Sequence, residues 1–151
     1  QIDQFLHYTG SDTAQITHAF TANYANPEDP YLQDFGEINL RSEQGTGYIR
    51  VDWFTPDALP TWGDGRLTIL GTDGYLELRK YVDVGGSEGA DHLILVNQSK
   101  SEKIDASNAG LPYFSRLAHD IEHRSETAMT QAYCFTVMEL ALLAQQMAEA
   151  E

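Results

Sequence analysis

Residues 45–80, GTGYIRVDWFTPDALPTWGDGRLTILGTDGYLELRK, contain three strand-like segments and their turns in close succession. Residues Tyr48–Phe54 alternate apolar with polar side chains, which predicts a β-strand with one buried face. Residues Arg66–Leu70 and Tyr75–Arg79 flank an Asp-Gly pair, which suits the positive backbone angles of a tight hairpin turn. The loop before this hairpin is rich in proline and glycine, so it should end the first strand.

Further strands are predicted on both sides of this stretch, at Ala14–Tyr24, Phe35–Arg41, His92–Asn97 and Glu102–Ala106. The connections are short, and parallel pairing would need crossovers of a dozen or more residues, so the sheet should be antiparallel. Strict alternation in the first of these strands places a mixed set on one face: Ile16, His18, Phe20, Ala22 and Tyr24.

Three helices complete the pattern. The chain opens with the end of a helix, in which Ile2, Phe5 and Leu6 share one face and Gly10 serves as the C-cap. Pro112 opens a second helix that ends near Arg124, with a predicted buried stripe of Phe114, Leu117, Ala118 and Ile121. Thr130 is the predicted N-cap of a long helix to Glu149, with recurring positions at Cys134, Val137, Met138, Ala141, Leu142 and Gln145. The fold class is therefore α+β, with an open antiparallel sheet of about six or seven strands and helices on one face, in a single domain of residues 1–151.

Composition excludes several classes of protein. Nine basic and 23 acidic residues give a net charge of −14, which repels nucleic acid and anionic membranes. No apolar run approaches the ~20 residues that span a bilayer, and no signal segment opens the chain, so we expect a soluble, cytoplasmic protein. The single cysteine, Cys134, has no second thiol to pair with and should be a small buried apolar residue.

Four segments together resemble a known family. Residues 51–81, VDWFTPDALPTWGDGRLTILGTDGYLELRKY, are similar to the C-terminal domain of the Gfo/Idh/MocA oxidoreductases, which are NAD(P)-dependent dehydrogenases acting mostly on sugars and polyols. The opening Gln1-Ile2-Asp3 and two later segments, Tyr113–Ile121 and Glu126–Ala132, resemble the same domain. The sequence departs from the family at Thr130 and Tyr133, where proline and histidine are expected in close relatives.

The resemblance implies a role for the chain within a larger enzyme. In the family, a preceding Rossmann domain binds NAD or NADP, and a catalytic Asp-x-x-x-His-x-x-Asp segment begins a helix. The histidine would stand immediately before Gln1, and Asp3 would be the last acid, bracing that helix. The chain would then be a C-terminal substrate-binding and oligomerisation domain without the Rossmann domain, inactive alone and binding no cofactor. The sheet face would pair with a second subunit in a homo-oligomer.

Five polar and aromatic residues are candidates for contact with a sugar or polyol: Arg50, Asp52, Trp62, Asp64 and Arg66. Aromatic rings stack on sugar faces and charged groups bond hydroxyls, which is what a polyol pocket requires. The alternative is a set of surface ion pairs and turn residues, but the family places a substrate-contacting residue in the loop that corresponds to Trp62–Arg66. A different class of function stays open, namely a stand-alone carbohydrate-binding or association module without catalysis.

Two other motifs are weaker evidence of function. His119-Asp120-Ile121-Glu122-His123 has the His-x-x-Glu-His order, in which histidines four apart could share a metal. A third ligand would have to come from elsewhere, and a solvated helix face explains the pattern more simply. The glycines of residues 85–89 lack the strand-then-helix context of a dinucleotide-binding loop. The sequence thus predicts neither a metal site nor a cofactor site within this chain.

Overall fold

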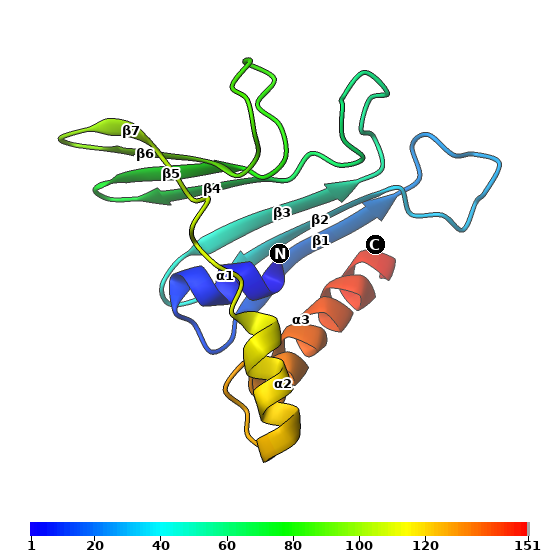
Figure 1. The fold of residues 1–151 in the computed structure, drawn as a ribbon. Helices are drawn as coiled ribbons and strands as arrows, with labels where there is room; N and C mark the ends of the chain where they lie inside the picture. The colour runs from blue at the N-terminus through cyan, green and yellow to red at the C-terminus, as the bar shows by residue number, and fades with distance from the viewer. Residues whose placement is uncertain (151) are drawn as a thin grey trace. The chain divides into compact units, whose positions relative to one another are not determined.

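The computed structural model describes residues 1–150, which form two compact units (Figure 1). Unit 1 consists of Gln1–Phe54 and the chain from Pro112 onward, and unit 2 is Thr55–Leu111. The elements of unit 1 are α1 (Ile2–Thr9), β1 (Gln15–Ala22), β2 (Phe35–Arg41), β3 (Thr46–Asp52), α2 (Tyr113–His123) and α3 (Gln131–Glu149). The elements of unit 2 are β4 (Arg66–Gly71), β5 (Gly74–Arg79), β6 (His92–Asn97) and β7 (Ser101–Ile104).

Strands β1, β2 and β3 form the sheet of unit 1, and both strand pairs are antiparallel. The pairing of β1 with β2 shifts register between Ile16 and His18. Because a bulge inserts one residue, it reverses which face the following side chains occupy. Ile16 and Ala19 are therefore both buried, whereas His18 contacts Glu37 across the strands. The predicted common face of Ile16 with His18 and Phe20 is wrong for this reason.

The core of unit 1 lies between this sheet and α3, which packs along β1 (Figure 1). Its buried members come from α1, the three strands and α3: Ile2, Leu6, Ile16, Ala19, Leu40, Ile49, Leu140 and Ala144. Helix α1 adds Ile2 and Leu6 and ends at Gly10, whose φ of 65° is left-handed as a C-cap requires. Thr130 caps α3 by accepting a hydrogen bond from the Tyr133 amide at 3.2 Å. Both predicted caps are confirmed.

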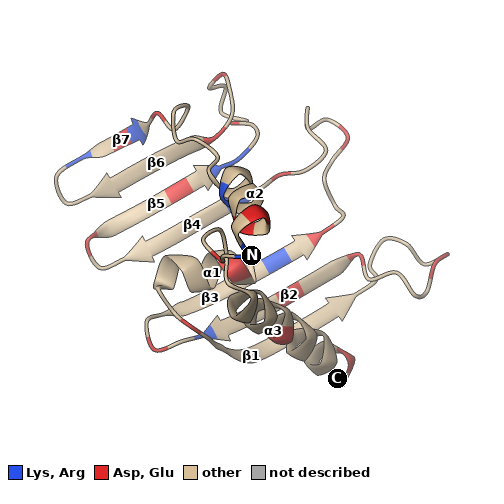
Figure 2. Cartoon of the chain, turned by 60° about the horizontal axis from the view of Figure 1, so that its bottom comes forward, with Lys and Arg blue, Asp and Glu red and all other residues tan. Residues whose placement is uncertain are grey.

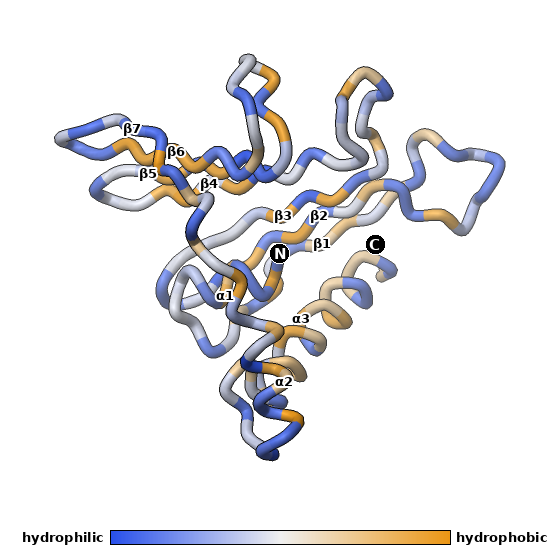
Figure 3. The backbone as a smooth tube through the Cα atoms, in the orientation of Figure 1, coloured by the Kyte–Doolittle hydropathy of each residue, from blue (hydrophilic) through white to orange (hydrophobic). Residues whose placement is uncertain are grey.

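Two predicted helix faces differ from the structure. Helix α3 is apolar around much of its circumference (Figure 3), and it turns Leu140 and Ala144 to the core while Cys134 is exposed. The predicted burial of Cys134 is therefore wrong. On α2, Phe114 is 74% and Ile121 64% exposed, so the predicted stripe is not buried among the described residues. A helical period identifies an apolar face, but it does not say what covers that face.

The sheet of unit 2 has the order β4-β5-β6-β7, with every neighbouring pair antiparallel. Its first hairpin turns at Thr72 and Asp73, and Gly74, the first residue of β5, has a φ of 156° and a position where an added Cβ would lie 2.1 Å from the Val96 carbonyl oxygen. Glycine is therefore required at that position. One face carries an apolar set in register across the strands, made of Leu67, Ile69, Leu76, Leu78, Leu93, Leu95 and Ile104. All seven are half-buried, and unit 2 contains no helix to cover them.

The predicted α+β class, with about six or seven antiparallel strands and helices, is confirmed, since residues 1–150 contain seven antiparallel strands and three helices. The structure adds that the strands form two open sheets, of three and four strands. Along residues 1–150, no helix is both long enough and apolar enough to cross a membrane.

Candidate functional site

Unit 1 contains a cavity of about 350 Å³ between its sheet and helices α1 and α3. Most lining side chains are apolar and several are small: Ala19, Ile38, Ile49, Val51, Val137, Ala141, Ala144 and Ala148. The polar lining residues include Gln1, Asp3 and Gln145. An engineered apolar cavity of about 150 Å³ can hold benzene, so this cavity has room for a compact ligand. Its lining matches the usual pattern of an apolar wall with a few polar groups.

Asp3 lies at this cavity and is tied to α3. The Tyr133 hydroxyl is 3.0 Å from Asp3 Oδ1 and 3.1 Å from the Asp3 carbonyl oxygen, so it donates to Asp3. Burial and the adjacent Asp3 carboxylate raise the pKa of Tyr133 to about 12. This contact joins the first turn of α1 to the first turn of α3. Sequence reasoning did not predict that Tyr133 bonds Asp3, although it noted that Tyr133 stands where the family has histidine.

Arg50 and Asp52 lie two residues apart on β3, so they share one face of the sheet. Arg50 Nε is 2.7 Å from Asp52 Oδ2, and the Arg50 guanidinium carbon is 5.4 Å from the centre of the Phe35 ring. Asp52 also accepts a hydrogen bond from the Phe54 amide at 3.0 Å. The pair is therefore anchored by an aromatic ring on one side and by the strand end on the other.

A second polar cluster on the three-stranded sheet was not foreseen. Glu37, on the central strand, accepts a hydrogen bond from the Tyr48 hydroxyl at 2.8 Å and lies 3.4 Å from His18 Nε2. The hydrogen bond to Glu37 raises the pKa of Tyr48. Three neighbouring strands each contribute one side chain, a combination that depends on register and on the β1 bulge.

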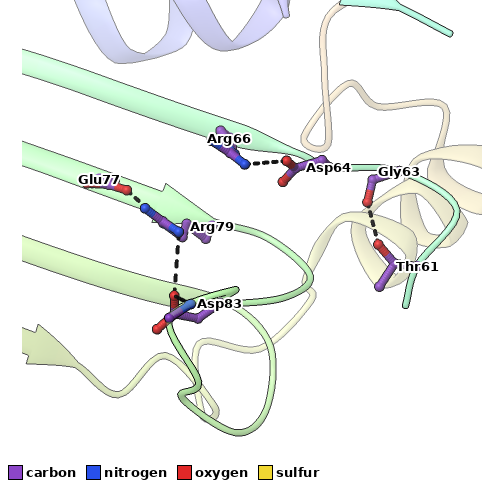
Figure 4. Close-up of polar contacts among 8 residues, drawn as sticks. Thr61, Gly63, Asp64, Arg66, Glu77, Arg79 and Asp83 are labelled. Atoms are coloured by element: carbon purple, nitrogen blue, oxygen red, sulfur yellow. Dashed lines mark hydrogen bonds and ion pairs between the residues drawn. The ribbon is translucent and has the colours of Figure 1, made fainter. Parts of the chain in front are cut away.

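The other three candidates lie in unit 2. Asp64 and Arg66 form an ion pair of 2.5 Å at the start of β4 (Figure 4), and the hydrogen bond that Arg66 donates to Asp64 raises the pKa of Arg66. Trp62 is 90% exposed in the preceding loop. That loop is shaped locally by the Thr61 hydroxyl, which donates to the Gly63 carbonyl at 2.6 Å.

The same figure shows a further arginine that sequence reasoning missed. Arg79, at the end of β5, bonds Glu77 at 2.9 Å and Asp83 at 3.4 Å (Figure 4). Hydrogen bonds from the Ser87 hydroxyl and the Gly85 amide lower the pKa of Asp83 to about 2. Acidic and basic side chains occur in both units (Figure 2), and both candidate arginines have a carboxylate partner two residues away.

The structure thus places the five candidates in two local sets. Arg50 and Asp52 belong to unit 1, whereas Trp62, Asp64 and Arg66 belong to unit 2. Each charged candidate forms an ion pair with another candidate of the same set, Arg50 with Asp52 and Arg66 with Asp64. None of the five candidates lines the cavity of unit 1.

Three solved structures share this fold. A protein of Erwinia carotovora atroseptica assigned as an oxidoreductase aligns with 98% of the chain at 45% identity and a TM-score of 0.92. Proteins with the same assignment from Thermotoga maritima and Bacillus subtilis align with 98% and 99% of the chain, at 17% identity each and TM-scores of 0.73 and 0.62. The chain spans 45%, 42% and 48% of these three proteins. No protein-family model and no curated protein matches the chain.

Proposed function

We propose that this chain is the C-terminal substrate-binding and oligomerisation domain of an NAD(P)-dependent oxidoreductase of the Gfo/Idh/MocA type, acting on a sugar or polyol. The observation that carries the proposal is the 45% identity, over 98% of the chain, to the Erwinia protein assigned as an oxidoreductase. The matches at 17% identity support the fold alone.

The proposal assigns NAD(P) to the part of the full-length protein outside this chain. A dinucleotide-binding unit needs parallel strands joined by a helix, and the strand pairs of residues 1–150 are all antiparallel. Bound NAD(P) would supply the hydride acceptor. The residues of this chain would bind and orient the substrate.

Two groups of residues support that role. Asp3, held by Tyr133, would position the helix that carries the family's catalytic histidine, beside a cavity with space for a compact ligand. Trp62, Asp64 and Arg66 would present an aromatic face, an acceptor and donors to hydroxyl groups.

Oligomerisation would use the apolar face of the unit 2 sheet. Seven half-buried apolar side chains in register on the unit 2 sheet form a surface of a kind that soluble proteins usually cover. The net charge of −14 opposes association of two copies at low salt, so added salt should favour a dimer. Sedimentation velocity should show a dimer at moderate salt, and Leu78→Glu should weaken it more than Thr68→Glu on the opposite face. A chain that stays monomeric at high concentration would contradict this part of the proposal.

The enzymatic part is tested with the full-length protein. Its reduction of NAD⁺ and NADP⁺ would be followed by absorbance with a panel of neutral sugars, polyols and sugar acids. We expect turnover with at least one neutral member. We also expect the 151-residue chain alone to show no turnover and no NADH binding by fluorescence titration. Micromolar NADH binding by the chain alone, or a full-length protein inert toward the whole panel, would overturn the proposal.

A further inference from the structure

Two histidine rings on α2 lie stacked at the surface. The ring centres of His119 and His123 are 4.1 Å apart and the ring planes differ by 19°. Both residues are exposed. Residues four apart on an α-helix lie on the same face, so both rings face the same region of solvent.

The second histidine has a defined tautomer. His123 Nδ1 lies 3.0 Å from the His119 carbonyl oxygen. A carbonyl oxygen can only accept, so Nδ1 carries the hydrogen in this contact, and the neutral ring keeps its lone pair on Nε2. Metal-binding histidines usually donate their other ring N–H to a carbonyl or carboxylate in this way, which fixes both tautomer and ring orientation.

The two carboxylates of α2 differ in their hydrogen bonding. Asp120 is buried and accepts hydrogen bonds from Ser125, Thr127 and Ala128. Glu122 is exposed, lies three residues after His119 and so beside that residue on the helix surface, and has no described hydrogen bond or ion pair. The acid that reinforces the helix end is therefore different from the acid that lies beside His119.

The geometry points to an open metal site on α2, in which Nε2 of His119 and of His123 bind a divalent first-row transition cation and Glu122 adds an oxygen ligand. In residues 1–150, no three His, Cys, Asp or Glu side chains already lie close enough to hold a metal together. Glu122 must therefore change rotamer, and water must fill the remaining positions. Imidazole ligands suit copper, nickel and zinc rather than magnesium or calcium, and affinity should rise from nickel to copper.

The site is tested by isothermal titration calorimetry of NiCl₂ into the 151-residue chain at pH 7.5, with MgCl₂ as the comparison cation. We expect one Ni²⁺ per chain, no detectable heat with Mg²⁺, and a Kd roughly tenfold or more higher for His119→Ala and for His123→Gln, because each variant loses one of two nitrogen ligands. His7→Ala removes an exposed histidine of α1 and should leave the Kd unchanged. Circular dichroism of each variant confirms that α2 remains folded.

Two outcomes would overturn the inference. The first is Ni²⁺ affinity that is the same in the chain and in both α2 histidine variants. The second is affinity lost as much in His7→Ala as in those variants. Glu122→Gln tests the oxygen ligand separately, because a several-fold weaker Kd supports it and an unchanged Kd removes Glu122 from the ligand set.

Discussion

Replacement of Tyr133 by phenylalanine tests whether the contact between α1 and α3 stabilises unit 1. The change removes one hydroxyl, which donates to the Asp3 carboxylate and backbone carbonyl at 3.0 and 3.1 Å, and leaves the ring in place. Hydrogen bonds to charged groups contribute about 1.5–3 kcal/mol. Because Tyr133 is only half-buried, we expect a loss at the lower end, about 1–2 kcal/mol. For a protein of this size, that loss lowers Tm by roughly 2–8 °C.

Circular dichroism at 222 nm is the appropriate assay, because all three helices belong to unit 1. Tyr31→Phe is the matched control, since Tyr31 is 94% exposed and has no described hydrogen bond. The pKa of Tyr133 adds a second test. A pKa raised to about 12 favours the neutral phenol in the folded state, so this contribution is fully present below about pH 10 and is lost as pH rises toward 12. If Tyr133→Phe has the same Tm as the Tyr31→Phe control, and the Tm of both variants changes equally at alkaline pH, the contact does not hold the helices together.

Three further results are expected. Hydrogen bonds from two amides and two hydroxyls outweigh the burial of Asp120 and lower the pKa of its carboxyl group. The contribution of Asp120 to stability is therefore present above about pH 4 and lost as pH falls below it. The difference in urea midpoint between the unsubstituted chain and Asp120→Asn should shrink as pH falls from 7 to 3. Gly74→Ala should destabilise unit 2, because the new Cβ would lie 2.1 Å from a backbone carbonyl of β6; Gly63→Ala, with no atom within 4 Å, should not, and amide hydrogen exchange in β5 and β6 distinguishes them. In the full-length enzyme, Asp64→Ala should lower kcat/KM by roughly ten- to over a hundred-fold and change Tm by only a few degrees, because its exposed ion pair contributes little to stability; unchanged kcat/KM would remove the loop from the site.

The strands could be predicted from sequence because each combines alternating side chains with short turns. The hairpin at Gly71–Gly74 is the clearest case, because both of its strands were predicted; its two-residue turn is Thr72-Asp73, and of the predicted Asp-Gly pair only Gly74 has a positive φ. The β1 bulge could not be predicted, because one inserted residue leaves the composition of the strand unchanged while it reverses the faces beyond Ile16. The apolar stripe of α2 was recognised correctly as a stripe, but its burial depends on what packs against it.

The candidate site shows the same division between local and distant information. Arg50 with Asp52, and Asp64 with Arg66, are two residues apart and pair as that spacing allows. The contact of Asp3 with Tyr133 joins positions 130 residues apart, and no local pattern announces it. Asp34 is another example. It is fully buried and accepts from the Tyr24 and Ala25 amides at 2.9 and 2.8 Å, partners that depend on the path of a loop.

The pairing of both candidate arginines bears on the class of substrate. An exposed ion pair is worth about 0–1 kcal/mol, so a ligand can rearrange it at little cost. Each opened pair then offers N–H donors beside a carboxylate acceptor, which matches hydroxyl groups, since every hydroxyl both donates and accepts. A carboxylated or phosphorylated ligand would use the donors but would be repelled by Asp52 or Asp64, and also by a chain with a net charge of −14. Within the proposed oxidoreductase, we therefore expect neutral sugars and polyols to be turned over with higher kcat/KM than sugar acids, and the reverse order would contradict this assignment of the paired residues.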